Sequence, residues 1–562
     1  MSKSICIVQN VDEIIYILNK VKKQKIFLPL DLSTQLYCIN NKIKFYDPLK
    51  LINKSFHQET LVYSKKLIQD LEFGDISMDS HKKELRAFVR FKFHSIAFLL
   101  ELIEQLKFAD KVDEIIVTGW DRYYDQFSKK NIFVSDLVFN LIKDVKITSL
   151  NKIIYENYSS NEEYDFQVND TNLERNKEYI LVTNLGYNFF RIVMSLQRQK
   201  MKIIVPLLGK IGFFKKIIYN LLKVKFVELK KTKSNNSFQI TLPKINFIYK
   251  GKDLSKILNS RLIQEKKNLI KLKTQSEAID NFFKRIRIKL VITNLSKGVF
   301  GYFIDLAKKS NITSICIPHG TLAQNFDEYD RIYKDTISEA VTSKNADFHA
   351  SQSIIAKEFF DLKKNNYNKI LNTGNLIFCG NKKKIKKKKN KILFAVTLKD
   401  FESIRPLGDE LYYEFLDNLY FLENLSKKHE LKFLVKLHPR GYDEFDNLKK
   451  AFPKLEFSKK KINKALDESF VTLTFSSTTI EDSLSSQCPV ILLDRWKRYK
   501  HCLAEENTKT KNSAVYYVDD GEKLIDCLKT ISLSENINFS KYYSNNNYNL
   551  NIKKTLNNFL SK

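Results

Sequence analysis

Glycine and proline are scarce in this chain, with 14 glycines and 9 prolines among 562 residues. The sequence contains no D-x-D triplet, no G-x-G-x-x-G loop and no G-x-x-x-x-G-K-[S/T] loop. These absences argue against an enzyme that clamps a nucleotide through a metal ion, a dinucleotide oxidoreductase and a P-loop enzyme. The dispersed histidines do not show the spacing of metal ligands, so we expect no metal site.

Seven cysteines are scattered along the chain, and no C-x-x-C pair occurs. The odd count predicts free thiols that serve as small core residues in a reducing compartment. No run of about 18 uncharged apolar residues is present, so we expect no membrane-spanning helix. The first ten residues, MSKSICIVQN, lack the apolar core of a signal peptide. Together these features predict a cytoplasmic protein.

The chain is strongly basic, with 95 Lys and Arg against 64 Asp and Glu, a net charge of +31. One interpretation is the composition of an AT-rich genome, which favours Lys, Asn and Ile. The other is attraction to an acidic partner such as a nucleotide, an anionic polymer or an anionic membrane. No nucleic-acid-binding motif occurs and Gly is sparse, so we predict that nucleic acid is not a partner.

The length is enough for three or four domains of about 150 residues each. Short apolar strands alternate with helical periodicities from Ser4 onward, which predicts an α/β fold with parallel sheets covered by helices. The run KKKIKKKKNK has like charges that resist packing, and it predicts a linker. We expect an N-terminal α/β region at 1–165, a Rossmann-like domain at 166–381, the linker at 382–391, a second Rossmann-like domain at 392–540 and a C-terminal tail or helix at 541–562.

Three predicted strands end in similar turns, in the sequences VTGW (117–120), VTNLG (182–186) and ITNLS (292–296). Ligands of open α/β sheets bind at the carboxyl ends of the strands, so these turns would line a cleft. Turn chemistry alone explains them equally well, because Asn and Gly tolerate the backbone angles of turns.

The segment GKIGFFKKIIYNLLKVKF, 209–226, combines apolar residues at helical spacing with flanking lysines. Such a helix can lie on an anionic bilayer surface. Phe213, Phe214, Lys215 and Lys216 would then make the membrane contact. The alternative is an ordinary half-buried helix with a solvated face.

The most informative stretch lies between Phe433 and Asp494. A short apolar strand stops at His438-Pro439, because proline cannot continue a strand ladder. A second strand runs into Ser476, Ser477 and Thr478, and a helix is predicted over 479–487, followed by Pro489 and a third strand. Hydroxyls at the start of a helix are expected to cap it and leave N–H groups that attract phosphate.

This order of motifs resembles the donor-binding domain of GT-B glycosyltransferases, over residues 290–495. The nearest resemblance is to bacterial capsule and surface-polysaccharide enzymes, namely sialyltransferase-like, Kdo-transferase-like and CDP-glycerol glycerophosphotransferase-like proteins. It implies two Rossmann-like domains that face each other across a cleft, here with an extra N-terminal α/β region.

The resemblance also implies an activity. A metal-independent transferase would move a sugar or a polyol phosphate from a nucleotide-activated donor, with CMP or CDP favoured. The acceptor would be a growing surface or capsular polysaccharide, either a glycan or a lipid-linked glycan, and no cofactor is required. Such an enzyme would be cytoplasmic and peripheral on the inner face of the cytoplasmic membrane.

Roles for individual residues follow from the same resemblance. His438, beside Pro439, would bind or protonate the leaving phosphate, and its pKa range suits either role. Donor phosphate and ribose contacts would come from Ser476, Ser477, Thr478, Asp482 and, second to Asp482, Glu481. The alternative for Asp482 is simple complementarity to the helix dipole in the first turn.

The catalytic base is expected in the turn Pro318-His319-Gly320-Thr321. His319 matches a histidine that has this role in the glycerophosphotransferase-like enzymes, and Asp327 and Glu328 are further candidates. A histidine satisfied by local hydrogen bonds is the alternative. The chain departs from sialyltransferases, whose acidic pair precedes the His-Pro motif, because its Asp-Asp-Gly triplet at 519–521 follows that motif. Leu376 also replaces the proline that usually follows Thr-Gly-Asn.

Two other functions compete with this one. A nucleotide-sugar 2-epimerase of the same fold would bind a similar donor, but those enzymes carry His-Val-Glu-Ala-Gly where this chain has Pro-His-Gly-Thr. A non-catalytic nucleotide-binding protein at the membrane surface would bind a nucleotide without turning it over.

Overall fold

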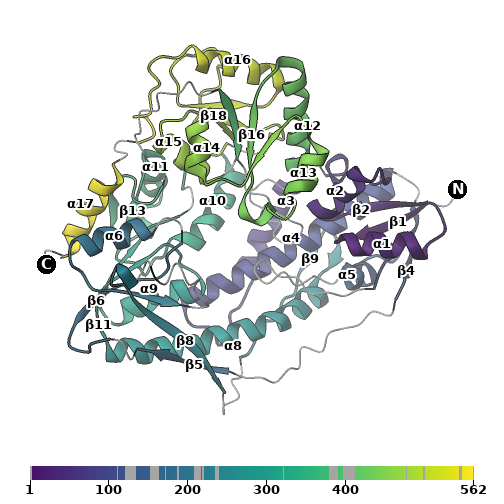
Figure 1. Cartoon of the computed structure of the whole chain (residues 1–562). Coiled ribbons are helices and arrows are strands. Elements are labelled where there is room, and N and C mark those ends of the chain that lie inside the picture. Colours follow the sequence, from purple (N-terminus) through teal and green to yellow (C-terminus); the bar gives the residue numbers. More distant parts are fainter. Residues whose placement is uncertain are drawn as a thin grey trace.

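The computed structural model shows three β-sheets flanked by helices (Figure 1). The residues that it describes are 3–52, 54–109, 112–119, 134–151, 164–170, 173–186, 189–207, 217, 220–233, 240–319, 322–378, 390–395, 412–475, 477–497, 500–543 and 547–560. A short antiparallel pair, β9 (Ile248–Tyr249) and β10 (Lys252–Asp253), stands apart from the three sheets.

The N-terminal sheet has four parallel strands in the order β2-β1-β3-β4. Its strands are β1 (Lys3–Val8), β2 (Lys25–Pro29), β3 (Val112–Val117) and β4 (Lys146–Ser149). Helices α1 (Val11–Lys20), α2 (Leu32–Asn40) and α5 (Val134–Leu141) accompany it. The start of α1 is fixed by a capping box, in which Asn10 accepts from the Glu13 N–H and Glu13 accepts from the Asn10 N–H.

The second sheet has eight strands in the order β14-β13-β12-β11-β6-β7-β8-β5. All pair in parallel except β5, which lies antiparallel to β8 at one edge. The strands are β5 (Tyr164–Asn169), β6 (Glu178–Val182), β7 (Ile203–Leu207), β8 (Lys225–Lys233), β11 (Arg287–Thr293), β12 (Thr313–Cys316), β13 (Phe348–Ser351) and β14 (Ile370–Asn372). The helices of this part are α6 (Phe190–Arg198), α8 (Ser255–Arg285), α9 (Gly298–Lys309), α10 (Glu328–Val341) and α11 (Ile354–Leu362).

The third sheet has six parallel strands in the order β17-β16-β15-β18-β19-β20. Its strands are β15 (Lys391–Ala395), β16 (Phe433–Lys436), β17 (Glu456–Ser458), β18 (Ser469–Thr474), β19 (Val490–Leu493) and β20 (Val515–Val518). The helices are α12 (Tyr412–His429), α13 (Phe445–Ala451), α14 (Ile462–Glu468), α15 (Thr479–Ser485) and α16 (Gly521–Ser532). The predicted α/β class with parallel sheets is therefore confirmed.

Both larger sheets follow the strand order 3-2-1-4-5-6 of a doubly wound fold. Counted along the chain, β15, β16 and β17 run outward one way, and β18, β19 and β20 run outward the other way. In the second sheet, β6, β7 and β8 and then β11, β12 and β13 do the same. The order thus reverses between β15 and β18 and between β6 and β11, and a crevice opens at the carboxyl ends of such strand pairs.

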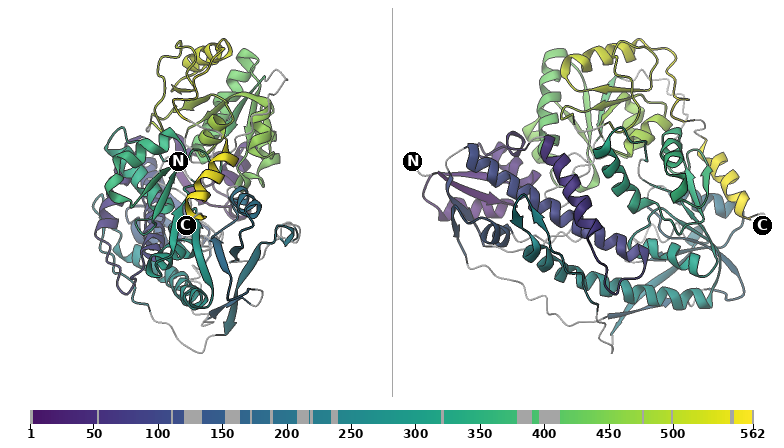
Figure 2. Two further views of the ribbon diagram at one scale, coloured as in Figure 1. Left: turned by 90° about the vertical axis from the view of Figure 1, so that its left-hand side faces the viewer. Right: turned by 180° about the vertical axis from the view of Figure 1, so that it is seen from behind.

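Two helices join the N-terminal region to the second sheet. Helix α4 (Asp79–Ala109) runs from the N-terminal sheet along α8 and α9, and α3 (Lys54–Gln69) packs on α10 (Figures 1 and 2). The Ser80 N–H donates to Asp305 of α9 at 3.0 Å, and His81 Nε2 lies 3.0 Å from Ser276 Oγ of α8. One apolar core also contains residues of the N-terminal region, of α8 and of the third sheet.

The end of the chain returns to the second sheet. Helix α17 (Tyr548–Leu560) lies beside α6, and its residues Ile552 and Leu556 are buried in the core of the second sheet (Figure 1). Asn551 Nδ2 donates to the carbonyl of Asn375 at 3.0 Å. The sequence-based expectation of a C-terminal helix that packs back across the domains is confirmed.

The helix predicted over 209–226 ends earlier than expected, because Lys225 and Phe226 are the first residues of β8. The physical reason is pairing on both sides, parallel to β7 and antiparallel to β5, which outweighs the helical apolar spacing. Phe213, Phe214, Lys215 and Lys216 lie outside the described residues. Among the described helices, none combines the length and apolarity needed to cross a membrane.

The cysteines of the described residues are free and buried. They are Cys6, Cys38, Cys316, Cys488, Cys502 and Cys527. Burial raises the pKa of the Cys6, Cys38, Cys316 and Cys502 thiols to about 12, so these thiols stay protonated and unreactive. The prediction of thiols as small core residues is confirmed for these positions.

A buried ion pair on α10 holds together the segment that leads out of the predicted catalytic turn. Lys334 Nζ lies 2.7 Å from Asp330 Oδ2, and both side chains are almost inaccessible to solvent. Asp330 also accepts from the Phe326 N–H at 2.9 Å, while Lys334 donates to the carbonyls of Gln324 and, at 3.4 Å, Lys500. The pair therefore connects the 322–327 loop of the second sheet to the part of the chain that follows β19.

We expect Asp330→Asn to lower the free energy of unfolding by about 3–5 kcal/mol, because it leaves the Lys334 ammonium buried without its counter-ion. The matched control is Asp361→Asn on α11, which breaks the exposed i,i+4 pair with Lys357. That change should cost less than about 1 kcal/mol. Urea unfolding followed by circular dichroism measures both, and equal effects of the two substitutions would contradict the role of the buried pair.

Candidate functional site

The predicted donor-side histidine lies where expected, directly beyond the carboxyl end of β16. His438 is partly buried, and its carbonyl accepts from the Gly441 N–H at 2.9 Å. Pro439 opens a short 3-10 turn, Pro439–Gly441, which ends the strand as the sequence predicted. Because β16 is the neighbour of β15, His438 is one strand away from the point where the order of the third sheet reverses.

The hydroxyl-rich turn follows β18, on the other side of the same switch point. Ser477 Oγ accepts from the Thr479 N–H at 3.2 Å and donates to Thr479 Oγ1 at 3.0 Å. Thr478 is the N-cap residue of α15 but makes no side-chain capping bond, since its own backbone is already helical. The expectation that hydroxyls cap this helix in the usual way is thus wrong for Ser477 and Thr478, and Ser476 lies outside the described residues.

Helix α15 is also shorter than predicted. It ends at Ser485 rather than at Gln487, whose φ of 56° is left-handed. Its first turn carries Glu481 and Asp482, and both side chains are largely buried.

Lys436, the last residue of β16, was not recognised in the sequence as a site residue. Its ammonium donates to the carbonyl of Leu437 at 2.7 Å. Burial lowers the pKa of Lys436, and the nearby Asp482 carboxylate opposes this shift. The lysine and the aspartate therefore face each other across the carboxyl ends of β16 and β18. A charged residue at the end of the apolar run FLV was the available signal.

The carboxyl edge of the second sheet carries the two Asn turns. Thr183 Oγ1 donates to Thr293 Oγ1 at 3.0 Å, and Asn184 Nδ2 donates to Asn294 Oδ1 at 2.6 Å. These bonds join the ends of β6 and β11 across the switch point, so the 182–186 and 292–296 turns lie together at one edge. The similar turn at 117–120 belongs instead to the N-terminal sheet, where Gly119 has a φ of 74°.

His319 follows β12 and is held against the turn after β11. Its Nδ1 lies 2.9 Å from the carbonyl oxygen of Asn294. Because a carbonyl can only accept, the ring must carry its proton on Nδ1, and the neutral ring then presents a lone pair at Nε2. The preceding Pro318 carbonyl accepts from Gln352 Nε2 at 2.7 Å. The local hydrogen bond expected in the structural alternative is therefore present, and it also sets the tautomer that a base requires.

The further base candidates are engaged elsewhere. Asp327 is the N-cap of α10 and accepts from the Asp330 N–H at 2.7 Å. Glu328 is exposed, and its hydrogen bond from Arg331 lowers its pKa. The Asp519–Gly521 triplet is likewise structural, since Asp519 pairs with Lys497 and Lys523 while Asp520 caps α16.

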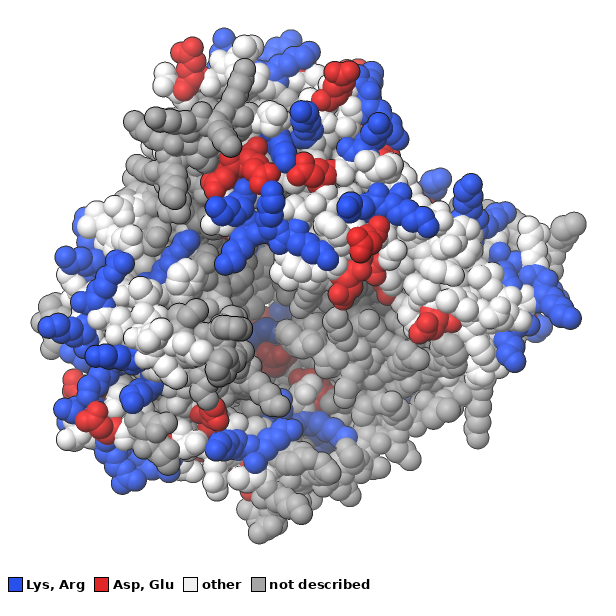
Figure 3. Space-filling model, in the orientation of Figure 1, with Lys and Arg blue, Asp and Glu red and all other residues white. Residues whose placement is uncertain are grey.

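The two candidate halves meet through an apolar contact. Ala323 and Ile355, from the second-sheet part, share one buried cluster with Ile480 and Leu484 of α15. Ala323 is four residues beyond His319, and Ile480 is two residues beyond Thr478. The carboxyl edges of both sheets are therefore brought to the same region. In the space-filling view, the surface is hollowed below the third-sheet part (Figure 3).

Comparison with known proteins points to transferases for part of the chain. A family model described as "LIC12162 family transferase" matches residues 360–510, less than half of the chain. The matched stretch contains the described residues Lys436, His438, Ser477 and Asp482. It lies largely within the region whose motifs resemble surface-polysaccharide transferases, and it supports that resemblance. No curated protein sequence matches the chain.

Several solved structures are similar in architecture. The UDP-GlcNAc 2-epimerase of Methanocaldococcus jannaschii is 14% identical, over 68% of this chain and 99% of that chain, with a TM-score of 0.41. The UDP-GlcNAc 2-epimerase of Neisseria meningitidis bound to UDP-GlcNAc is 13% identical, over 69% and 100%, with a TM-score of 0.42. The wall teichoic acid polymerase TagF with CDPG is 11% identical, over 70% and 90%, with a TM-score of 0.36.

We expect Lys436→Met to weaken the binding of a nucleoside diphosphate about tenfold, because an anionic phosphate loses a nearby cation while the Asp482 carboxylate stays. The matched control is Lys432→Met, an exposed lysine just before the same strand. Calorimetric titration of both folded variants with CDP and UDP measures the effect. Equal affinities of the two variants would remove Lys436 from the site.

Proposed function

We propose that the protein is a GT-B glycosyltransferase that moves a sugar or a polyol phosphate from a nucleotide-activated donor to a growing surface or capsular polysaccharide. The observation that carries the proposal is the meeting of two carboxyl sheet edges, each with a histidine at a strand end. His438 lies on one side with Lys436 and the Ser477 turn, and His319 lies on the other side. The transferase family match over 360–510 supports the same conclusion.

In the proposed reaction the third-sheet part holds the donor. Phosphate charge is met by Lys436, by His438 and by the hydroxyls of Ser477 and Thr478, which can donate to phosphate oxygens. Asp482 and Glu481, on the first turn of α15, are proposed to bind ribose hydroxyls, and Lys436 offsets the charge of Asp482. CMP or CDP is the favoured nucleotide on the resemblance alone.

His319 is proposed to deprotonate the acceptor hydroxyl. Its Nε2 lone pair takes the proton as the acceptor oxygen forms a bond to the donor carbon, or to the donor phosphorus if a polyol phosphate is moved. The bond to the leaving nucleotide breaks, and His438 can return a proton to the departing phosphate. The charge of that phosphate is met by protein groups, so we propose that the reaction needs neither a divalent metal nor a cofactor.

The proposed acceptor is a glycan or a lipid-linked glycan at the inner face of the cytoplasmic membrane. On the face shown in Figure 3, Lys and Arg side chains are spread over all parts of the molecule rather than gathered in one patch. Contact with an anionic membrane through 209–226 stays a prediction, because most of that segment lies outside the described residues.

A screen of nucleotides by thermal shift tests the donor site. CMP, CDP, UDP and GDP are compared, and a ligand raises stability by RT ln(1 + [L]/Kd), about 2.7 kcal/mol at a hundredfold excess over Kd. We expect one pyrimidine nucleotide to stand out and His438→Ala to weaken its binding by about 1.5–3 kcal/mol, the range for hydrogen bonds to charged groups. His429→Ala, an exposed histidine at the end of α12, is the control. Unchanged affinity in a folded His438→Ala protein would refute the site.

Turnover with the donor so identified tests the base and the metal separately. We expect His319→Ala to lower kcat by about 10²–10⁴-fold, because a general base is lost, while donor binding stays nearly intact. EDTA should leave wild-type activity unchanged. A near-normal kcat in His319→Ala would remove the base assignment, and activity lost to EDTA but restored by Mg²⁺ or Mn²⁺ would remove the metal-free mechanism. Conversion of the donor to its 2-epimer without transfer would identify an epimerase instead.

A further inference from the structure

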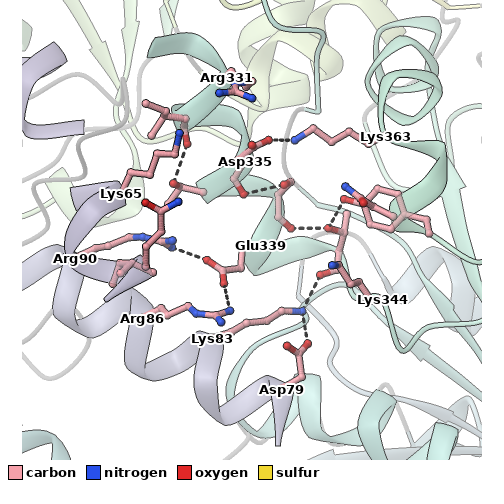
Figure 4. A pocket seen from close by; sticks show the side chains of 18 residues that line it. Lys65, Asp79, Lys83, Arg86, Arg90, Arg331, Asp335, Glu339, Lys344 and Lys363 are labelled. Atoms are coloured by element: carbon pink, nitrogen blue, oxygen red, sulfur yellow. Dashed lines mark hydrogen bonds and ion pairs between the residues drawn. The ribbon is translucent and has the colours of Figure 1, made fainter. Parts of the chain in front are cut away.

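A second cavity, which we call the basic pocket, lies away from both histidines, between α3 and α4 on one side and α10 on the other (Figure 4). Its volume is about 520 Å³, within the usual range for small-molecule sites. Seven of its lining residues are basic and three are acidic. The basic residues are Lys65, Lys83, Arg86, Arg90, Arg331, Lys344 and Lys363, and the acidic residues are Asp79, Asp335 and Glu339.

One wall of the pocket is a row of cations on α4. Arg86 and Arg90 each donate through Nη1 to one oxygen of Glu339, both at 2.6 Å, and their side chains are only 27% and 14% exposed. Burial would raise the pKa of Glu339, but the two guanidinium groups outweigh it and hold that pKa below its ordinary value. Each guanidinium has five N–H donors, so a single carboxylate does not use the capacity of two of them.

The opposite wall belongs to the second-sheet part of the chain. Lys363 pairs with Asp335, whereas the exposed Lys344 has no hydrogen-bond or ion-pair partner among the described residues. At the rim, Lys65 and Arg331 share one acidic residue, Glu328. Figure 4 shows the α4 arginines and Lys344 with Lys363 on opposite sides of the cavity.

The charges of the pocket are therefore not balanced by its own residues. Lys83 is neutralised by Asp79 at 2.7 Å and Lys363 by Asp335, but Arg86 and Arg90 share one carboxylate and Lys344 has none. Like charges gathered in a partly desolvated cavity repel one another, and an anion that enters it relieves this repulsion. Two walls of cations favour a ligand with an anionic group at each end.

We propose that the basic pocket binds a small ligand that carries at least two anionic groups, phosphate or carboxylate. The site is distinct from the proposed donor site, because no residue of that site lines it. The proposal does not depend on the transferase activity. It does place the ligand against α10, whose carbonyl at Glu339 accepts from Ser296 Oγ at 2.6 Å, two residues beyond the carbonyl that holds His319.

Calorimetric titration with inorganic pyrophosphate at low salt tests the proposal, in a His438→Ala background so that the donor site contributes little. We expect one site whose affinity falls as salt rises, because the attraction is screened. Lys344→Glu should weaken binding about tenfold or more. Lys344 is exposed, so this change should leave the fold intact, and Arg90→Gln gives a second variant on the opposite wall. The control is Lys309→Glu, an exposed lysine at the end of α9 with the same change of charge.

Two sources of the ligand are separated by a second titration. A trimer of galacturonic acid represents a carboxylated glycan, and maltotriose is its uncharged counterpart. Binding of the acidic trimer, abolished by Lys344→Glu, assigns the pocket to an acidic glycan, whereas binding of pyrophosphate alone assigns it to a free phosphorylated compound. Absence of binding by either anion, or equal affinities in Lys344→Glu and Lys309→Glu, would overturn the proposal.

Discussion

The reversal of strand order is the constraint on which the rest of this structure depends. In a parallel sheet all the strands deliver their turns to one edge, and helices that leave a switch point in opposite directions cannot cover that edge. Both large sheets contain such a point, between β6 and β11 and between β15 and β18. Polar turn residues are therefore tolerated there, because the backbone of the turns is satisfied by side chains such as Gln352 and Asn294 rather than by a neighbouring strand.

Helix α10 links the parts of the molecule that the sheets leave separate. Its N-terminal end carries the buried Asp330–Lys334 pair, which anchors the loop after His319 and reaches the carbonyl of Lys500. Its C-terminal end carries Glu339, which gathers two arginines of α4. One helix thus contacts the N-terminal region, the turn that holds His319 and the third-sheet part. A change in its position would be felt at all three, since packed elements move as units.

Much of this arrangement was predictable from local sequence. Apolar runs that stop at Pro439 or at Pro318 mark strand ends, and strand ends fix which residues share an edge. The class of fold and the positions of His319 and His438 followed from that logic. The cap of α15 was not predictable in the same way, because several adjacent hydroxyls compete, and Ser477 bonds to Thr479 instead of Thr478 capping the helix.

Long-range pairings were beyond the sequence. Lys436 gains its meaning only from Asp482, on a different strand connection, and the basic pocket joins Arg86 to Glu339 across 253 residues. No periodicity relates such positions, since the pairing is set by how α4 crosses α10. The helix predicted over 209–226 failed at its end for the same reason, because the strand partners of Phe226 are distant in the chain.

The return of α17 to the second sheet has a consequence for the order in which the protein is made. During synthesis the strands of the second sheet leave the ribosome before those of the third, yet Ile552 and Leu556 of the second core come after the last strand of the third. The third sheet can therefore be complete while the second core still has an open apolar face. Until α17 is added, that face must be shielded or left exposed to neighbouring chains, so the middle of this molecule is finished last.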